Sequence, residues 1–379
     1  MYRIFSLRQP QAERYMRHVP TRMQALCILF VCMLMLCLSL PTSYVVEGAG
    51  PALNVNGEIS GKKIVTISGE QTYSTQSQLF LTTVTAWGTA DQGVSGFQAL
   101  WALIDPHEQL YPVRALYPAS LTAEEVARKD TQAMESSQDS AAAVAMTLAG
   151  LPVIEKLTVA SVDERFPAGK YLKVGDELQL MREHGADEYR EVKNFLDVST
   201  FMRSIQPGQI IDLRVLRNGE VEEFSFEAVS PELDTTGWMR PGAMIGVGLQ
   251  VSDIEFPANA EYAVDNIGGP SAGMMFALGI YDALTEGSLA GKSVIGGTGT
   301  MNWNGDVGAI GGITHKMLGA HKVGVTDFLA PAVNCAETAG YIPEGMRVWA
   351  VRNISEAIAA AEAIGKGDTS ELTACSAIR

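Results

Sequence analysis

A serine at the start of an apolar helix is the first feature of this chain that could carry out chemistry. Ser271 follows the run Asp265-Asn-Ile-Gly-Gly-Pro and precedes the strongly apolar segment 274–284. Unpaired backbone N–H groups and the positive end of the helix dipole favour a developing oxyanion at such a position. Serine is also a common helix cap, so capping alone is an alternative interpretation of Ser271.

The spacing Gly269-x-Ser271-x-Gly273 also fits the nucleophile elbow of α/β-hydrolases. An elbow needs an apolar strand directly before the serine, and segment 261–268 is not such a strand. It also needs a histidine after an acidic residue, and only His315 and His321 lie downstream. The sequence therefore disfavours a Ser-His-Asp triad.

A lysine can activate a serine instead, provided that burial removes its proton near neutral pH. On the helical segment 313–323, Lys316 shares a face with the small and apolar residues, whereas His315 and Lys322 fall on the opposite, polar side. Lys292 lies in a turn, where we expect it to be solvated. Lys316 is thus the candidate for a buried amine, although lysine stems also commonly cover apolar surface while the head reaches water.

Two motifs together carry a family resemblance. Gly268-Gly-Pro-Ser-Ala-Gly273 and Gly311-Gly-Ile-Thr-His-Lys316 resemble the proteolytic domain of the Lon family of Ser-Lys proteases, with serine and lysine 45 residues apart. The resemblance covers roughly residues 245–365. It implies that Ser271 is the nucleophile and Lys316 the general base.

The same resemblance implies supporting roles near this pair. Thr298 matches the family threonine that helps to hold the lysine amine, and Asp265 is expected to shape the serine loop or to cap its turn. The backbone around the serine, at Gly269, Pro270 and Ala272, is expected to form the oxyanion site. No metal and no cofactor are expected.

The chain departs from full-length Lon enzymes in one respect that bears on energy use. Those enzymes carry an ATPase module, whereas this sequence has no Gly-x-x-x-x-Gly-Lys-Ser/Thr phosphate loop. Where ATP-dependent members have Thr-Gly-Glu, this chain has Thr298-Gly-Thr300. We therefore expect no ATP requirement, and cleavage of accessible segments rather than driven unfolding.

Composition excludes some partners. The chain has 379 residues, is 47% hydrophobic and carries a formal net charge of −15. A core of this size excludes a disordered or fibrous protein, and the acidic field opposes binding to nucleic-acid phosphates. Cys335 and Cys375 could form a disulfide, which spacing alone does not establish.

The N-terminal part has the composition of a membrane anchor. No charged residue lies between Met23 and Val46, and the charged side chains before this run, with histidine counted as neutral, are five arginines and one glutamate. A span of roughly 20 apolar residues can cross a bilayer as a helix, and the basic flank predicts a cytoplasmic N-terminus. We expect a single-pass protein of the cell membrane that contacts lipid through residues 24–46 and has its bulk outside the cytoplasm. A cleaved signal peptide is the alternative.

The middle of the chain resembles a PDZ domain. A Pro167-Ala-Gly loop, a helix over 195–204 and strands on either side of Asn218-Gly219 occur in the order of that family. PDZ domains bind the C-terminus of another chain as an added strand, with loop amides holding the carboxylate. The resemblance implies Gly150, Leu151 and Pro152 as the candidate loop, and a packing module without a ligand is the alternative.

These observations predict an α+β protein with a transmembrane helix, a PDZ-like β-rich domain and a C-terminal Lon-type proteolytic domain. We predict a basic leader (1–23), an anchor (24–46), an extracytoplasmic α/β region packing with the protease domain (47–144), the PDZ-like domain (145–232), the Lon-like domain (233–366) and a tail (367–379). Whether 47–144 completes the protease sheet stays open here, and the strand 245–254 is expected to belong to the Lon-like domain.

The sequence therefore predicts an ATP-independent, membrane-anchored serine endopeptidase that cleaves extracytoplasmic or membrane-associated proteins and uses its PDZ-like domain for recognition or regulation. Its partners would be protein or peptide substrates and further copies of itself, since Lon-like domains often form rings. A catalytically inactive PDZ-type adaptor and an esterase are the alternatives.

Overall fold

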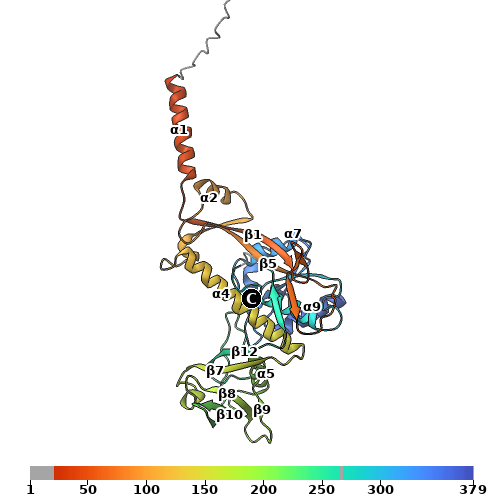
Figure 1. Cartoon of the computed structure of the whole chain (residues 1–379). Helices are drawn as coiled ribbons and strands as arrows, with labels where there is room; N and C mark the ends of the chain where they lie inside the picture. The colour runs from red at the N-terminus through yellow and green to blue at the C-terminus, as the bar shows by residue number, and fades with distance from the viewer. Residues whose placement is uncertain (1–20, 265–267, 379) are drawn as a thin grey trace, which may run out of the picture.

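The computed structural model describes residues 21–264 and 268–378. A single helix, α1 (Arg22–Ser39), projects from the body of the molecule, and none of its residues is buried (Figure 1). It is long and apolar enough to cross a membrane, although a signal sequence has the same properties. The helix ends before the expected anchor does, because Leu40 is extended in front of Pro41, which disfavours a helical residue before it.

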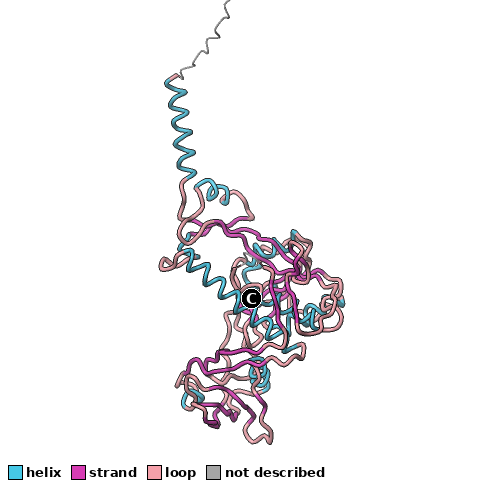
Figure 2. Tube along the Cα trace, viewed as in Figure 1, coloured by secondary structure: helices cyan, strands magenta, loops and turns pink. Residues whose placement is uncertain are grey.

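Below α1 the chain forms two lobes (Figures 1 and 2). The larger lobe is built on a six-stranded sheet with the order β18-β17-β14-β5-β1-β6. Strands β6, β1 and β5 are antiparallel, whereas β5, β14, β17 and β18 run parallel. The bounds are β1 Tyr44–Asn54, β5 Gln78–Trp87, β6 Glu108–Pro112, β14 Val294–Gly297, β17 Asp327–Pro331 and β18 Arg347–Val351. Residues 47–112 therefore complete the same sheet as the C-terminal strands.

Helices cover both faces of this sheet. Leu79 and Leu81 of β5 point into the core shared with α4 (Ala123–Leu148), α6 (Gly273–Leu284) and α9 (Ile354–Lys366). Phe80 points to the opposite face, where α7 (Ile313–Lys322) packs. This alternation is what a strand buried on both faces requires. Segment 122–148 forms one helix, which a Thr122–Glu125 capping box begins.

Short elements complete the larger lobe. They are β2 Glu58–Ile59, β3 Lys62–Lys63, β4 Val65–Ser68, α2 Gly96–Ala102, α3 Val113–Leu116, β13 Asn259–Tyr262, β15 Thr300–Met301, β16 Val307–Gly308, η2 Ala332–Asn334, α8 Cys335–Thr338 and η3 Cys375–Ala377. The cysteines Cys335 and Cys375 are joined in a disulfide that ties η3 to α8.

The smaller lobe has its own sheet and its own apolar core. The strand order is β11-β10-β8-β7-β12, with β9 beside β8, and α5 and η1 pack against it. At the β10–β11 turn, Asn218 and Gly219 have φ angles of +52° and +86°, as a tight hairpin turn demands. The bounds are β7 Ile154–Val162, η1 Pro167–Lys170, β8 Glu177–Glu183, β9 Arg190–Glu191, α5 Phe195–Ser204, β10 Ile210–Arg217, β11 Glu220–Glu227 and β12 Val247–Glu255.

One strand lies in a different sheet from the one expected. Strand β12 covers the segment 245–254 that was assigned to the Lon-like domain, yet it pairs with β7 along its whole length in the smaller lobe. The smaller lobe therefore extends past residue 232, and the chain returns to the larger lobe only at β13, which pairs with β4. Apolar content marks a strand but does not say which sheet it joins.

Candidate active site

The serine loop is held from several sides before it enters α6. The carbonyl of Pro270 accepts a hydrogen bond from Ser137 Oγ of α4 at 2.8 Å, and the Gly269 amide donates to the Asp130 carbonyl at 3.2 Å. The carbonyl of Ser271 accepts from the Gly299 amide at 2.9 Å. The N-cap position is Ala272, and among the described residues no side chain caps this helix. The Ser271 hydroxyl is therefore not used for capping.

Lys316 reaches this serine from α7 and is only 2% exposed. Its Nζ lies 2.8 Å from Ser271 Oγ, 3.2 Å from Thr298 Oγ1 and 3.1 Å from the carbonyl oxygen of Thr82. The structure thus brings together Ser271, Lys316 and Thr298. The fourth group, the Thr82 carbonyl of β5, was missed, because a backbone oxygen leaves no residue-type signal in a sequence.

The hydrogen bonds orient the lysine amine. Thr298 Oγ1 donates its own proton to the Ser271 carbonyl at 3.0 Å, so it can only accept from Lys316. The Thr82 carbonyl can also only accept. A neutral amine has two N–H bonds and one lone pair. With both N–H bonds directed at Thr298 and Thr82, the lone pair remains for the hydroxyl proton of Ser271.

Burial also prepares this amine for proton transfer. Desolvation lowers the pKa of Lys316 from 10.5 to about 8, and the nearby Glu47 opposes this shift. Burial in turn raises the pKa of Glu47, which the Lys316 charge partly offsets. Glu47 lines a hollow beside Lys316 and Ser271, and sequence analysis did not single it out. A general base is most effective when its pKa lies near the working pH.

Backbone donors near the serine differ in their availability. The Gly269 amide is engaged with Asp130, and Pro270 has no N–H group, so neither supplies an oxyanion donor of the kind expected. Within the described residues, the amides of Ser271 and Ala272 donate to no protein acceptor, and they lie at the positive end of α6. Asp265 lies outside the described residues.

The other basic groups lie away from the serine. Lys292 and Lys322 are exposed, as expected. His315 is buried, which corrects the expectation of a polar face there, and burial lowers its pKa. Among residues 21–264 and 268–378, no group of three His, Cys, Asp or Glu side chains is arranged to hold a metal ion.

Two hollows flank the serine and lysine. One, of about 530 Å³, runs along β5 from Thr82 to Ala86, and the other, of about 290 Å³, lies beside Glu47 and segment 309–311. Strand β14 pairs with β5 only over residues 78–81, so none of the described strands lies on that side of β5 beyond Leu81. An extended peptide could pair with this free edge and pass Ser271.

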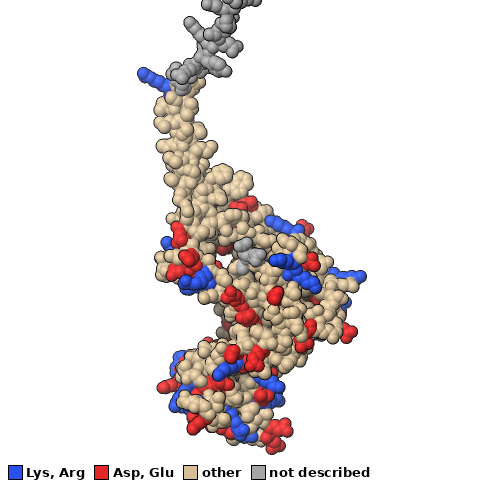
Figure 3. Space-filling model, in the orientation of Figure 1, with Lys and Arg blue, Asp and Glu red and all other residues tan. Residues whose placement is uncertain are grey.

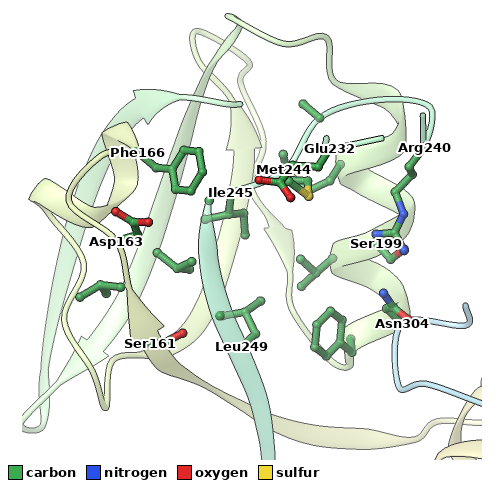
Figure 4. A pocket seen from close by; sticks show the side chains of 18 residues that line it. Ser161, Asp163, Phe166, Ser199, Glu232, Arg240, Met244, Ile245, Leu249 and Asn304 are labelled. Carbon is green, nitrogen blue, oxygen red and sulfur yellow. The ribbon is translucent and has the colours of Figure 1, made fainter. Parts of the chain in front are cut away.

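A second concave site lies in the smaller lobe. A groove of about 400 Å³ separates α5 from the first residues of β12, which is the edge strand of its sheet. Figure 4 shows Ile245 and Leu249 in this groove, with Phe166 and Asn304 at opposite ends. Ser199 of α5 also lines it, and its buried hydroxyl has no hydrogen-bond partner within residues 21–264 and 268–378. Asn304 comes from the larger lobe, in the turn between β15 and β16.

The segment expected to hold a peptide carboxylate lies elsewhere. Gly150 and Leu151 follow the end of α4, and their amides donate to the carbonyls of Thr147 and Met146. Leu151 packs against the core of the larger lobe, and none of residues 150–152 lines the groove. The loop before β12, at residues 243–246, faces the groove instead. Sequence order did not reveal this, because β12 was assigned to the other domain.

A serine hydroxyl at a helix start, hydrogen-bonded to a buried lysine amine, defines a Ser-Lys hydrolase site. Comparison with known proteins gives the particular family. Residues 257–363 match the Lon protease (S16) C-terminal proteolytic domain. Residues 257–363 of the chain therefore form a Lon-type proteolytic domain.

Relatives share only this part. The Lon protease of Clostridioides difficile is 39% identical over 79 residues, which is 21% of this chain and 10% of that protein. The Lon protease of Buchnera aphidicola is 38% identical over 93 residues, 24% of this chain and 12% of that protein. The matched part is thus about a tenth of the length of these relatives.

Among solved structures, the PDZ domain of an SdrC-like protein from Listeria monocytogenes covers 25% of this chain and 87% of its own, with 19% identity and a TM-score of 0.20. The corresponding domain from Listeria innocua covers 24% and 92%, with 21% identity and a TM-score of 0.19.

Proposed function

We propose that this protein is an ATP-independent serine endopeptidase, anchored in the cytoplasmic membrane, that cleaves extracytoplasmic or membrane-associated polypeptides. Ser271 is the nucleophile and Lys316 the general base. The observation that carries this proposal is the 2.8 Å contact between Lys316 Nζ and Ser271 Oγ at a lysine that is 2% exposed. Thr298 is a positioning residue, because it acts through the lysine amine.

The reaction proceeds in two steps. Ser271 Oγ attacks the peptide carbonyl while neutral Lys316 takes the hydroxyl proton, and the amides of Ser271 and Ala272 bind the oxyanion. The protonated lysine then gives its proton to the leaving amine as the C–N bond breaks. A water molecule attacks the acyl-enzyme with Lys316 again as base, which releases the acid product and restores Ser271.

The substrate strand lies along the free edge of β5. Residues 82–86 line the larger hollow together with Ser271 and Lys316, so a peptide in this hollow would pair with backbone and pass the nucleophile. Recognition through backbone favours extended, unfolded or terminal segments. This agrees with the absence of a phosphate-loop motif in the sequence, since such segments need no ATP-driven unfolding.

Two features support a location outside the cytoplasm. Helix α1 follows a segment rich in arginine, which favours a cytoplasmic N-terminus and an exported body. The Cys335–Cys375 disulfide is typical of proteins that fold in an oxidising compartment. Figure 3 shows α1 as a column without charged side chains after its first residue, whereas charges of both signs cover the lobes.

The smaller lobe is proposed to bind peptides by their C-termini. An added strand would pair with the edge of β12 between Leu249 and α5, and the loop 243–246 would hold the carboxylate. Because Asn304 of the larger lobe lines the same groove, a bound peptide would touch the protease lobe directly. This supports a role in delivering or regulating substrates. Assembly into a homo-oligomer stays part of the proposal by family resemblance.

The test is cleavage of an unfolded protein, such as reduced casein, by the full chain in detergent without ATP. Ser271→Ala and Lys316→Ala should both abolish the fragments seen by mass spectrometry. Lys322→Ala is the matched control, because Lys322 is an exposed lysine of the same helix, and it should cleave normally. Cleavage by either site variant at the parent's rate would contradict the proposal.

The groove of the smaller lobe favours a second candidate function, an adaptor that binds peptides without cutting them. A folded parent that binds C-terminal peptides and cleaves no polypeptide would support the adaptor. Turnover of small esters alone would support an esterase.

A further inference from the structure

Helix α2 presents a set of large apolar side chains to the outside of the molecule. Ala99 and Ala102 face inward, where they pack with Val46 and Val94. The opposite side and the residues after it are exposed: Phe97 60%, Leu100 49%, Trp101 54%, Leu103 70% and Ile104 71%. We call these five residues the α2 patch. Soluble surfaces seldom gather so many large apolar side chains in one place, so this patch needs a partner.

The α2 patch lies at the end of α1. The amide of Gly96 donates to the carbonyl of Leu40 at 3.0 Å, and Ser95 bridges to Pro41. A Cβ at Gly96 would lie 3.3 Å from the carbonyl oxygen of Cys37, so α2 begins level with the last turn of α1. Figure 1 shows α2 beside that end of α1, whereas the smaller lobe lies at the opposite end of the larger lobe.

The chemistry of the patch matches a lipid interface. No charged residue occurs from Gln92 to Ile104. Trp101 and Trp87, with Phe97, line a hollow of about 330 Å³ that opens beside Glu108. Tryptophan favours the boundary between headgroups and acyl chains, because its ring is apolar and its N–H is polar. A short helix with one apolar side and no buried charge suits this boundary.

We propose that the α2 patch inserts into the headgroup–acyl boundary of the leaflet where α1 ends, as a second membrane contact of the chain. The proposal rests on the proposed anchoring of α1. Lipid is the occupant that the geometry favours, because the patch adjoins the apolar surface of α1, none of whose residues is buried, and is level with its last turn. A second copy of the chain bound to this patch would have to displace the lipid that surrounds the last turn of α1 at the same level.

Two contacts fix the tilt of the larger lobe, whereas one helix alone would let it swivel. Strand β1 leads from the end of α1 to Glu47, which lines the hollow beside Lys316. The seven residue-to-residue steps from Leu40 to Glu47 span at most about 25 Å. Glu47 is therefore held within about that distance of the end of α1, and the serine lies across the hollow that Glu47 lines, which suits segments of polypeptide close to the membrane.

The test is fluorescence of the full chain in phosphatidylcholine–phosphatidylglycerol vesicles, with and without lipids brominated near the headgroup. Subtracting the emission of Trp101→Phe from that of the parent isolates Trp101. We expect brominated lipid to lower the Trp101 signal at least about twofold. Trp238, which lies over Arg352, serves as the matched control through Trp238→Phe, and its signal should not change.

A second variant leaves Trp101 in place and changes the apolar side chains beside it, so that the test does not depend on replacing Trp101. Leu103→Asp with Ile104→Asp alters two exposed side chains, so we expect it to fold, to cleave a short soluble peptide at the parent's rate and to lose the quenching of Trp101. An unquenched Trp101 in a parent that floats with vesicles would overturn this proposal alone. Unquenched Trp101 with an altered oligomeric mass in the double variant would instead assign the patch to a second copy. Failure of the parent to float would overturn the anchoring of α1 and this proposal with it.

Discussion

The serine site and the α5–β12 groove differ in how their polar groups are used. At the serine site, the two N–H bonds and the lone pair of the neutral Lys316 amine each have a hydrogen-bond partner. Thr82, Thr298 and Ser271 supply these partners from three separate segments. In the groove, the buried hydroxyl of Ser199 has no partner in the described part of the chain, and β12 offers an edge that none of the described strands pairs with.

The comparison separates chemistry from recognition. Proton transfer needs atoms held in one arrangement before the substrate arrives, and the enclosed hydrogen bonds of Lys316 provide it. Binding of varied peptides needs polar groups and a strand edge that stay open until a ligand satisfies them. The following experiments test this division, beginning with the largest expected effect.

Lys316→Arg should abolish peptide cleavage as fully as loss of the serine does. Arginine keeps the positive charge and the length, but it cannot lose its proton, so it cannot act as the base. We expect a loss of at least about 10³-fold in kcat/KM. Peptide binding in the groove, measured by calorimetry, should stay unchanged. Retention of more than a tenth of the activity would mean that the lysine acts only through its charge.

Glu155→Gln should make the smaller lobe more stable at neutral pH. Glu155 of β7 accepts a hydrogen bond from the Phe195 amide at the start of α5, and burial raises its pKa to about 7. The folded state then holds a proton that the unfolded state loses above its pKa of 4.5, so stability falls as pH rises from 4.5 to 7. Glutamine keeps the acceptor and removes this loss, which amounts to at most about 3 kcal/mol.

The measurement is the free energy of unfolding of the smaller lobe in urea, taken at pH 5 and at pH 7.5. The difference between these two values is compared in the parent and in Glu155→Gln. Cleavage by Ser271 should not change, because Glu155 lies on β7 in the smaller lobe and lines neither hollow at the serine. Equal pH dependence in parent and variant would contradict a buried, protonated Glu155.

Thr298→Val should slow cleavage about 30-fold, because one N–H of Lys316 loses its acceptor and the lone pair is no longer held toward Ser271. Thr298→Ser keeps the hydroxyl and should restore most of the activity. The serine variant separates the hydroxyl from the packing role of a residue that is fully buried. Equal losses in both variants would show that only the packing matters.

Leu249→Lys should weaken binding of C-terminal peptides about tenfold without changing cleavage of a short soluble peptide. Leu249 is partly buried in the groove, and a lysine there would compete for the space of the added strand. Pro152→Ala is the matched control, since Pro152 is exposed and does not line the groove. Binding lost in the control but not in Leu249→Lys would return the peptide site to residues 150–152.

The sequence predicted the chemistry of the serine site better than its surroundings. Ser271, Lys316 and Thr298 meet as their motifs indicate, because each side chain leaves a residue-type signal at a recognisable spacing. Thr82 and Glu47 come from a segment without a motif, 234 residues away from Lys316 in the case of Thr82. Only the assembled sheet brings that segment to α7.

The groove was harder to predict for a different reason. The helix α5 and the Asn218-Gly219 hairpin have local signals, and both occur where expected. The strand that completes the groove, β12, lies after a long linker, and its apolar pattern suits either sheet. Local periodicity predicts that a strand exists, whereas its neighbours depend on packing between distant segments.

The pH dependence of kcat/KM tests the central claim most directly. If neutral Lys316 is the base, cleavage of a short peptide should rise with pH and level off above an apparent pKa of about 8, since burial lowers the lysine pKa to that value. Glu47→Gln should move this midpoint to lower pH, because the carboxylate no longer favours the charged amine. A flat profile, or a fall from neutral to mildly alkaline pH in a folded enzyme, would contradict the Ser271–Lys316 mechanism.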